Sequence, residues 1–192
     1  MSPLPLTLTA IAGVGETDYS ANSGRSELRL AAEASLAAIR DAGLAPADID
    51  GLVTFTLDAN DELELQRSLG IPALEWTGRT PFGGMGACAA VQMAAAAVAA
   101  GAANAVLVYR AFNERSGARF GSPETARSIG AAGRKNDFHY DFGFDTAAKS
   151  YAMDFQPYAR RYGVTSEDLG RYVVSTRAYA ATNPRAAYLA GR

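Results

Sequence analysis

The sequence predicts an α/β protein in which a small parallel sheet is layered with helices. Three observations lead to this class. Short apolar runs alternate with helix-length amphipathic stripes, the order strand–helix–strand recurs over residues 1–111, and an alanine-rich helix at residues 87–100 leads directly into another apolar run. Strands that are joined by helical crossovers lie parallel, with right-handed connections. The 192 residues suffice for one sizeable domain or for a domain with an additional segment.

Composition narrows the classes of function. The net charge is −2 at pH 7, and no basic patch or acidic tail indicates nucleic acid as a partner. A single cysteine, Cys88, excludes an internal disulfide framework. The first residues lack the basic and long apolar regions of a secretory signal, and no apolar run reaches the roughly 20 residues that span a bilayer. We therefore expect a cytoplasmic protein without a membrane span.

The first part of the chain shows strand and helix signals in alternation. Residues 4–12 alternate in polarity and predict a first strand. Ser26 is a plausible N-cap for a helix that reaches residue 41, and residues 49–55 predict a second strand. A short helix within residues 58–70 and a short strand at residues 74–77 follow.

The alanine-rich segment is the centre of this prediction. Between Ala87 and Ala100 its only polar residue is Gln92, and Gly101 ends it. A helix that is apolar all round has no solvated face, so we expect it to be buried on all sides. The next strand is predicted at residues 105–108.

The second part of the chain, residues 112–192, is predicted as an irregular loop domain with helices. Residues 110–146 are polar, rich in glycine and without periodicity, and loops of this length are usually functional. A helix follows at residues 146–162, in which Pro157 suggests a kink or a break. A capping sequence that begins at Thr165 starts the last helix, whose core stripe is Leu169, Val173 and Val174.

The N-terminal end of the central helix is the candidate site. Gly83, Gly84 and Gly86 precede or begin it, and glycines allow a ligand to approach the backbone closely. Unpaired N–H groups at a helix N-terminus suit a thiolate, an enolate oxygen or a phosphate. The alternative is a tight strand-to-helix turn with no ligand, because the dinucleotide fingerprint GxGxxG is not present.

Three stretches together resemble the N-terminal half of the thiolase superfamily, in its sterol-carrier-protein-X and lipid-transfer branch. They are LAAIRDAGL with ADIDGLV (residues 36–53), MAAAAVAAGAANAVLV (residues 93–108), and YGVTSEDL followed by Ala178 and NPRA (residues 162–186). The loop segment FNERSG at residues 112–117 is most similar to the steroid side-chain retro-aldolases of that branch. The resemblance covers nearly the whole chain and implies a thiolase-like layered fold, in which the chain is a βαβαβ half with a central buried helix.

The resemblance places the nucleophilic cysteine of thiolases at Gly84, which has no side chain. Cys88 lies four residues further, about 6 Å along the helix axis, so we expect it to be a small buried core residue. The alternative is that Cys88 is an activated nucleophile. With glycine in that position, the resemblance implies retro-aldol cleavage of a β-hydroxyacyl-CoA, such as a 17-hydroxy steroid side-chain CoA thioester, to a ketone and propionyl-CoA.

Other candidate residues lie in the loop and in the helix after it. His139, Tyr140 and Tyr151 are candidate catalytic or hydrogen-bonding groups, although aromatic residues there are more often packing residues. Arg115 and Arg119 are candidates for the CoA phosphates, although charged loop residues are usually only solvated.

The resemblance also implies the partners. We expect an acyl-CoA substrate, no further cofactor, no metal, a homodimer, and a hetero-complex with a small OB-fold protein. The acid and base are expected in a second half of the fold that this chain does not contain. Two other functions remain open: an acyl-transferring thiolase that uses Cys88, and a non-catalytic subunit that binds lipid or acyl-CoA.

Overall fold

The computed structural model describes residues 9–55, 58, 60–81, 85–114, 116–117, 142–144 and 146–186. These residues form two compact units. The first comprises the described parts of Met1–Thr17 and Gly24–Asn113, and the second comprises those of Asp18–Ser23 and Glu114–Arg192. The predicted division between residues 111 and 112 stays a prediction.

The first unit is an α/β layer around a three-stranded parallel sheet. Its elements are, in order, α1 (Glu27–Asp41), the 3₁₀ helix η2 (Pro46–Asp48), β1 (Gly51–Phe55), α2 (Glu62–Leu69), β2 (Trp76–Thr80), α3 (Gly86–Ala99) and β3 (Val106–Val108). The strand order is β2-β1-β3, and both pairs are parallel. Leu52 of β1 lies opposite Thr77 of β2 and Leu107 of β3. The predicted α/β class is confirmed.

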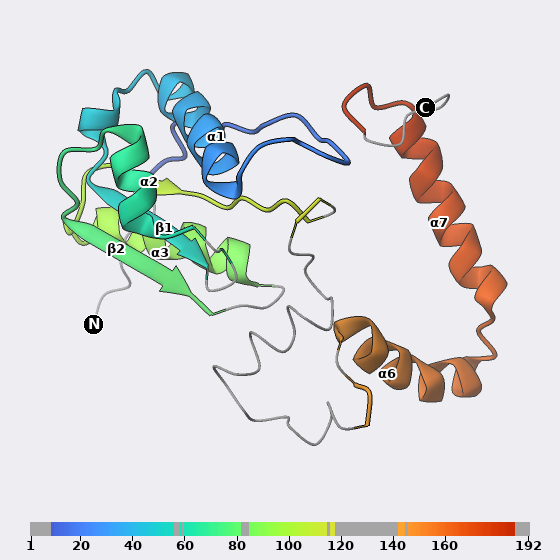
Figure 1. The fold of residues 1–192 in the computed structure, drawn as a ribbon. Coiled ribbons are helices and arrows are strands. Elements are labelled where there is room, and N and C mark those ends of the chain that lie inside the picture. Colours follow the sequence, from blue (N-terminus) through green and yellow to red (C-terminus); the bar gives the residue numbers. More distant parts are fainter. Residues whose placement is uncertain are drawn as a thin grey trace. The chain divides into compact units, whose positions relative to one another are not determined.

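Helices cover both faces of this sheet (Figure 1). Successive residues of β1 belong to two different core clusters, one on each face. Leu52 is fully buried in a cluster with residues of α1 and α2, such as Ile39 and Leu65. Val53 is fully buried on the other face, where it packs with Ala90 and Ala94 of α3. Because both of its faces are covered, β1 is buried along its whole length, which is typical of a central parallel strand.

Local signals explain where the helices begin and end. The Ser26 hydroxyl accepts a hydrogen bond from the backbone N–H of Arg29 at 3.2 Å and so caps α1. Asp61 caps α2 in the same way, by accepting from the N–H of Leu63 at 2.8 Å. Gly70 ends α2 in the left-handed conformation, with φ of 72°, which glycine adopts without strain.

The prediction of a first strand at residues 4–12 is wrong for the part that the structure describes, residues 9–12, which are not in a strand. The chain instead runs against α1. A Cβ at Gly15 would lie 2.1 Å from the backbone O of Ala34, and the N–H of Val14 donates to the Asp41 carboxylate at 2.9 Å. A segment that is packed on a helix backbone in this way is not available to extend the sheet.

The sequence predicts that the central helix α3 is buried on all sides, but in the structure it is buried on one face only. Its buried residues recur along one face: Gly86, Ala90, Ala94 and Ala97. This face packs on the sheet, whereas Val91 and Gln92 on the other side are exposed. The sequence could not show this, because alanine occupies both faces of α3 and gives no amphipathic contrast.

Asp50 joins the starts of all three strands. Its backbone carbonyl accepts hydrogen bonds from the N–H groups of Glu75 at 2.8 Å and Trp76 at 3.2 Å, just where β2 begins. Its carboxylate accepts from the N–H and side chain of Asn104 and from the N–H of Ala105, all at 2.8–2.9 Å, just before β3. These contacts place the strand that was predicted at residues 74–77 two residues later, at Trp76–Thr80.

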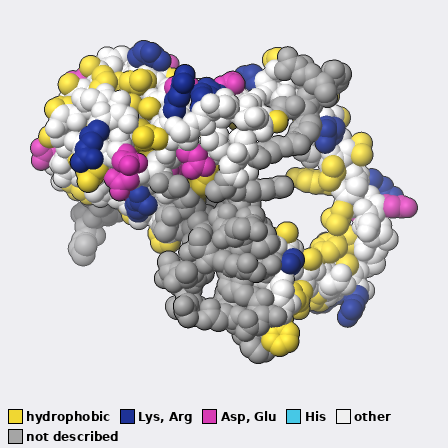
Figure 2. Space-filling view, in the orientation of Figure 1, with side chains coloured by type: hydrophobic (Ala, Val, Ile, Leu, Met, Phe, Trp, Pro, Cys, Tyr) yellow, Lys and Arg dark blue, Asp and Glu magenta, His cyan; other side chains and the backbone are white. Residues whose placement is uncertain are grey.

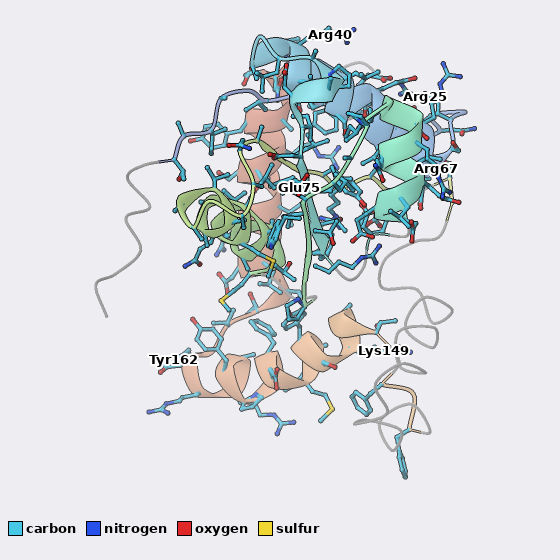
Figure 3. The ribbon with its side chains drawn as sticks, turned by 90° about the vertical axis from the view of Figure 1, so that its left-hand side faces the viewer. Arg25, Arg40, Arg67, Glu75, Lys149 and Tyr162 are labelled. Carbon is cyan, nitrogen blue, oxygen red and sulfur yellow. The ribbon has the colours of Figure 1, made fainter. Side chains whose placement is uncertain are left out.

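The second unit contains the two predicted helices, α6 (Ala147–Tyr162) and α7 (Ser166–Ala181). Pro157 does not break α6, which continues through it. Thr165 and Asp168 form the predicted capping box at the start of α7. Figure 3 shows Lys149 near the first turn of α6 and Tyr162 at its end.

The predicted core stripe of α7 is wrong in this structure. Leu169, Val173 and Val174 are 49%, 58% and 69% exposed, and α7 has no buried residue. Hydrophobic side chains are visible on the surface over both α6 and α7 (Figure 2). The stripe was predicted from its helical spacing, but spacing identifies a face that needs a partner and does not say where that partner lies.

Candidate active site

The candidate site lies at the carboxyl edge of the sheet, which we define as the edge where β1, β2 and β3 end. Phe55, the last residue of β1, is buried and packs on the first turn of α3. A Cβ at Gly86 would lie 3.2 Å from the Phe55 ring and 3.3 Å from the Pro81 carbonyl oxygen, so a side chain there would require these neighbours to shift by a few tenths of an ångström. The buried Thr80 hydroxyl donates to the Gly86 carbonyl at 3.1 Å and fixes the start of the helix.

Arg110, two residues beyond β3, lies beside Phe55. Its guanidinium carbon is 4.7 Å from the centre of the Phe55 ring and 4.5 Å from that of Phe112. The two rings meet edge to face, with centres 6.2 Å apart and an angle of 78° between their planes. The cation is therefore held in the corner between two aromatic rings, an arrangement that is attractive because the ring faces carry partial negative charge.

Arg110 and Phe112 belong to residues 109–113, which we call the β3 exit segment. Its side chains alternate as in a strand, because Tyr109 and Ala111 are buried while Arg110 is exposed and Phe112 is half-buried. The inward residues are anchored. The Tyr109 hydroxyl donates to the Asn60 carbonyl at 3.1 Å, and the Tyr109 carbonyl accepts from the Thr54 hydroxyl at 3.0 Å.

The far end of the β3 exit segment is tied to the beginning of α1. The Asn113 N–H donates to the Glu27 carboxylate at 3.0 Å, and its side-chain amide donates to the Arg25 carbonyl at 2.6 Å. The segment is thus held from both ends, and the outward residues Arg110 and Phe112 project from a fixed backbone.

Asp58, 3% exposed, is the buried carboxylate that joins two loops at this edge. One of its oxygens accepts from the backbone N–H and the side-chain amide of Asn60, at 2.8 and 2.6 Å. The other accepts from the N–H of Ala111 at 2.8 Å. A buried carboxylate needs such donors to offset the loss of hydration. Asp58 therefore positions the loop after β1 against the β3 exit segment.

An ion pair closes the outer side of this cluster. Arg79 of β2 makes a two-point contact with the Glu62 carboxylate, at 2.5 and 2.7 Å, and also donates to the Asn60 carbonyl at 3.3 Å. The hydrogen bonds from Arg79 lower the pKa of Glu62, and those to Glu62 raise the pKa of Arg79. Burial, followed by the nearby carboxylates of Glu62 and Asp58, raises the pKa of Tyr109 well above its usual range. Tyr109 is thus a neutral hydrogen-bond donor at physiological pH.

Most predicted site residues fall outside the described part of the chain. These are Gly83, Gly84, Arg115, Arg119, His139 and Tyr140. Of the two that are described, Gly86 is the first residue of α3 and is buried at the carboxyl edge. Tyr151 lies on α6, in the second unit, and is 72% exposed. The roles predicted for all eight residues stay predictions.

The expectation that Cys88 is a buried core residue is wrong in this structure, where its thiol is exposed. Cys88 lies in the first turn of α3, two positions after Gly86, and is therefore rotated by about 200° around the helix axis from it. Gly86 faces the sheet, so Cys88 faces away from it. The error has the same origin as the prediction that α3 is buried all round.

The aromatic corner around Arg110 and the hydrogen bonds that hold it were not predicted from the sequence. Residues 110–146 were predicted to be an aperiodic loop. Two signals were present: the alternation of Tyr109, Arg110, Ala111 and Phe112 continues the pattern of the preceding strand, and Asp58 with Asn60 has the spacing of a turn in which the carboxylate accepts from the residue two positions later.

Comparison with known proteins gives close relatives over almost the whole chain. It is 52% identical, over 188 residues, to a "steroid side-chain-cleaving aldolase" of Thermomonospora curvata, covering 97% of this chain and 48% of that protein. It is 51% identical, over 179 residues, to a "17-hydroxy-3-oxo-4-pregnene-20-carboxyl-CoA lyase" of Mycobacterium tuberculosis, covering 92% of this chain and 46% of that protein. The predicted resemblance is confirmed. No family model matches the chain.

A solved structure has the same fold over the matched region. A chain of the structure titled "Ltp2-ChsH2(DUF35) aldolase" superimposes with a TM-score of 0.78 at 50% sequence identity, covering 93% of this chain and 45% of that one. The chain thus spans about half the length of the relatives that it matches. The similarity therefore concerns about half of each of these relatives.

The residues that the structure describes offer neither a membrane-spanning helix nor a cluster of metal ligands. Within those residues, no helix has the length and apolar character that crossing a membrane requires. The same residues contain no group of three or more histidine, cysteine or carboxylate side chains placed to hold a metal ion.

Proposed function

We propose that this chain forms half of a carbon–carbon lyase that cleaves a β-hydroxyacyl-CoA by a retro-aldol reaction. The substrate class is a 17-hydroxy steroid with a CoA thioester on its side chain. The observation that carries the proposal is the identity of 51–52% to two proteins named for this activity, spread over 92–97% of the chain.

The reaction requires a base, a bond cleavage and an enolate. A base removes the proton of the 17-hydroxyl, its oxygen electrons form the ketone, and the bond between carbon 17 and the side chain breaks. That electron pair passes to the thioester as an enolate, which takes up a proton to give propionyl-CoA. The enolate oxygen needs fixed hydrogen-bond donors, and the backbone at the start of α3, with Gly84 in the nucleophile position, is the part of this chain proposed to provide them.

The base is proposed to lie outside these 192 residues, in the half of the relatives that the chain does not match. The active form is proposed to be a homodimer in complex with a small OB-fold partner, and to need no cofactor other than the CoA of its substrate. The related aldolase structure, which is named for Ltp2 together with ChsH2(DUF35), supports the hetero-complex.

The test is to incubate the full-length protein, with and without its partner, with 17-hydroxy-3-oxo-4-pregnene-20-carboxyl-CoA. The expected products are the 17-ketone and propionyl-CoA in equal amounts, detected by liquid chromatography and mass spectrometry. Tight binding of the thioester without products, in the complete complex, would contradict the lyase and favour a binding subunit.

The exposure of Cys88 favours one second candidate, an acyl-transferring thiolase. An exposed thiol in the first turn of α3 is accessible to a thioester, which a core cysteine would not be. Cys88→Ala separates the two functions. A lyase keeps its turnover in this variant, whereas an enzyme that forms an acyl-cysteine loses both turnover and the mass increase of its acylated form.

A further inference from the structure

The second unit carries two consecutive helices whose side chains are not packed into a core. α6 and α7 have 16 residues each and are joined by residues 163–165. No residue of either helix for which the structure gives an exposure is buried. Helices in proteins owe most of their stability to the packing of an apolar face, so both α6 and α7 need a surface to pack on.

α6 presents a stripe of aromatic side chains. Tyr151, Phe155, Tyr158 and Tyr162 follow one another at intervals of four, three and four residues, which places them on one face of the helix. The ring centres of Phe155 and Tyr158 are 5.9 Å apart, and those of Tyr158 and Tyr162 are 4.8 Å apart. Because the three tyrosines are 52–72% exposed, these rings form an apolar surface that is open to solvent.

α7 presents a second stripe. Leu169, Tyr172, Val173 and Tyr179 lie on one side of this helix, because the residues that separate them number three, four or a full heptad. All four are exposed, and Figure 2 shows hydrophobic side chains on the surface over both helices. The two stripes therefore continue from one helix to the next without a covering layer.

Tyrosine is the commonest residue of the two stripes and indicates what kind of surface covers them. It combines an apolar ring with a hydroxyl that needs a hydrogen-bond partner when it is buried, and it is enriched at protein interfaces. Contacts between two parts of one chain are more polar than the interfaces of obligate complexes. The stripes fit a contact of this kind better than they fit a purely apolar core.

The relatives contain a large amount of chain that is available for such a contact. The Thermomonospora curvata aldolase is matched over 97% of this chain, which includes both helices, but over only 48% of its own length. The solved aldolase structure is matched over 93% of this chain and 45% of its own. More than half of each of these relatives thus lies outside the region to which α6 and α7 belong.

We propose that the stripes of α6 and α7 pack on the second half of the fold, the part of the relatives that these 192 residues do not match, within the same polypeptide. The inference rests on the proposed function for the existence of that second half. A segment of the same polypeptide is present at an effective concentration of about 1 mM, whatever the protein concentration. It covers the stripes permanently, whereas a second copy or a partner protein leaves them exposed whenever the complex dissociates.

Photo-cross-linking in the full-length protein, with its partner present, identifies what covers the stripes. The photoreactive residue p-benzoylphenylalanine is incorporated in place of Tyr158 in α6 or of Tyr172 in α7, so that one aromatic side chain replaces another. After irradiation, the intact mass shows how many chains are joined, and peptide mapping shows where the cross-link lies. We expect a cross-link within one polypeptide, from each position to residues outside the 192 of this sequence.

Positions on the opposite sides of the two helices are the matched controls. Arg160 and Val174 each lie two residues after a test position, about 200° around the helix axis from it, and both are exposed. We expect the cross-link to be lost when the photoreactive residue is placed at either of them.

Two neighbouring valines make the same distinction without a cross-linker. Val173→Asp puts a charge on the stripe, whereas Val174→Asp puts the same charge on another side of α7. We expect Val173→Asp in the full-length protein to raise the rate of proteolysis within α6 and α7 at least about 10-fold, because packing of the stripe would bury the charge. The rate for Val174→Asp is expected to stay within about twofold of wild type.

Four cross-linking results would overturn the inference: a link to a second copy, a link to the partner protein, a link to residues 1–192 of the same chain, or no link above that of the controls. Equal proteolysis of Val173→Asp and Val174→Asp would overturn it too, and the cross-links decide if Val173→Asp does not fold. The proposed function is tested separately. An active lyase whose stripes link to a second copy refutes only this inference, and links to the second half without steroid cleavage refute only the lyase.

Discussion

Replacing Asp50 by asparagine tests how the three strands are held in register. The Asp50 carboxylate accepts from two backbone N–H groups and from the side-chain amide of Asn104. Asparagine keeps one oxygen for the backbone donors but turns an NH₂ group toward the Asn104 amide. One hydrogen bond is lost, and the others lose their charge assistance.

The expected cost follows from these contacts. A hydrogen bond to a charged group contributes about 1.5–3 kcal/mol and a neutral one about 1 kcal/mol. Asp50 is partly exposed, so we take the lower end and expect Asp50→Asn to lower the free energy of unfolding by about 2 kcal/mol. For a chain of this size, that corresponds to a decrease in Tm of ~4–8 °C.

The difference in stability between wild type and Asp50→Asn should also depend on pH. Burial raises the pKa of Asp50, but the N–H donors of Ala105 and Asn104 outweigh it, so the pKa is lowered on folding. Stabilisation by a carboxyl with a lowered pKa is present above the unfolded pKa of about 3.9 and is lost as pH falls through the folded pKa. The gap between wild type and Asp50→Asn, full at pH 7, should therefore shrink below about pH 4.

Urea unfolding followed by tryptophan fluorescence measures this gap, because the single tryptophan, Trp76, begins β2 and its N–H donates to the Asp50 carbonyl. The control is Glu75→Gln. Glu75, which Figure 3 labels, is exposed and directly precedes Trp76 in the sequence, and we expect its substitution to change the free energy of unfolding by no more than about 0.5 kcal/mol. Equal stability of Asp50→Asn and wild type at pH 7, or a gap that persists unchanged to pH 2, would refute the reasoning.

Three further substitutions test other parts of the structure by urea unfolding, followed by Trp76 fluorescence for the first unit and by far-ultraviolet circular dichroism for α7. Gly15→Ala should lower the free energy of unfolding by ~3 kcal/mol or more, because the new Cβ would overlap the backbone of α1. A cost below about 1 kcal/mol would show that the backbone at Gly15 does not lie against α1. Tyr109→Phe should cost about 1 kcal/mol, because a buried hydroxyl that donates to the Asn60 carbonyl is lost, and no change would contradict that bond. Gly170→Ala should raise the stability of α7 by about 0.5–1 kcal/mol, because its Cβ would meet open space in a helix, and a loss would contradict the helical assignment.

The elements that the sequence predicted correctly are those with strong local signals. α1 has a serine cap and a one-sided stripe, α2 has an aspartate cap and a terminal glycine, and α7 has a capping box. Each signal acts within a few residues and needs no knowledge of the rest of the fold. The parallel sheet followed from the alternation of strands and helices.

The predictions that failed are those that depend on what lies next to an element. Cys88 and Val91 are apolar residues on an alanine-rich helix, and only the position of the sheet decides that they are exposed. The same holds for Val173 on α7. Arg110 was missed for a related reason, since its aromatic corner joins Phe55 and Phe112, residues 57 positions apart, and only the pairing of β1 with β3 brings them together.

The strand order β2-β1-β3 has a consequence for synthesis of the protein. The middle strand leaves the ribosome first, and both of its hydrogen-bonding neighbours are made later, the second of them ending at Val108. Until β2 and β3 are made, its five buried residues have unpaired backbone edges, and one of its faces stays uncovered until α3 is complete. Nascent chains that stop between Phe55 and Val108 are therefore the forms most prone to aggregate and most in need of a chaperone.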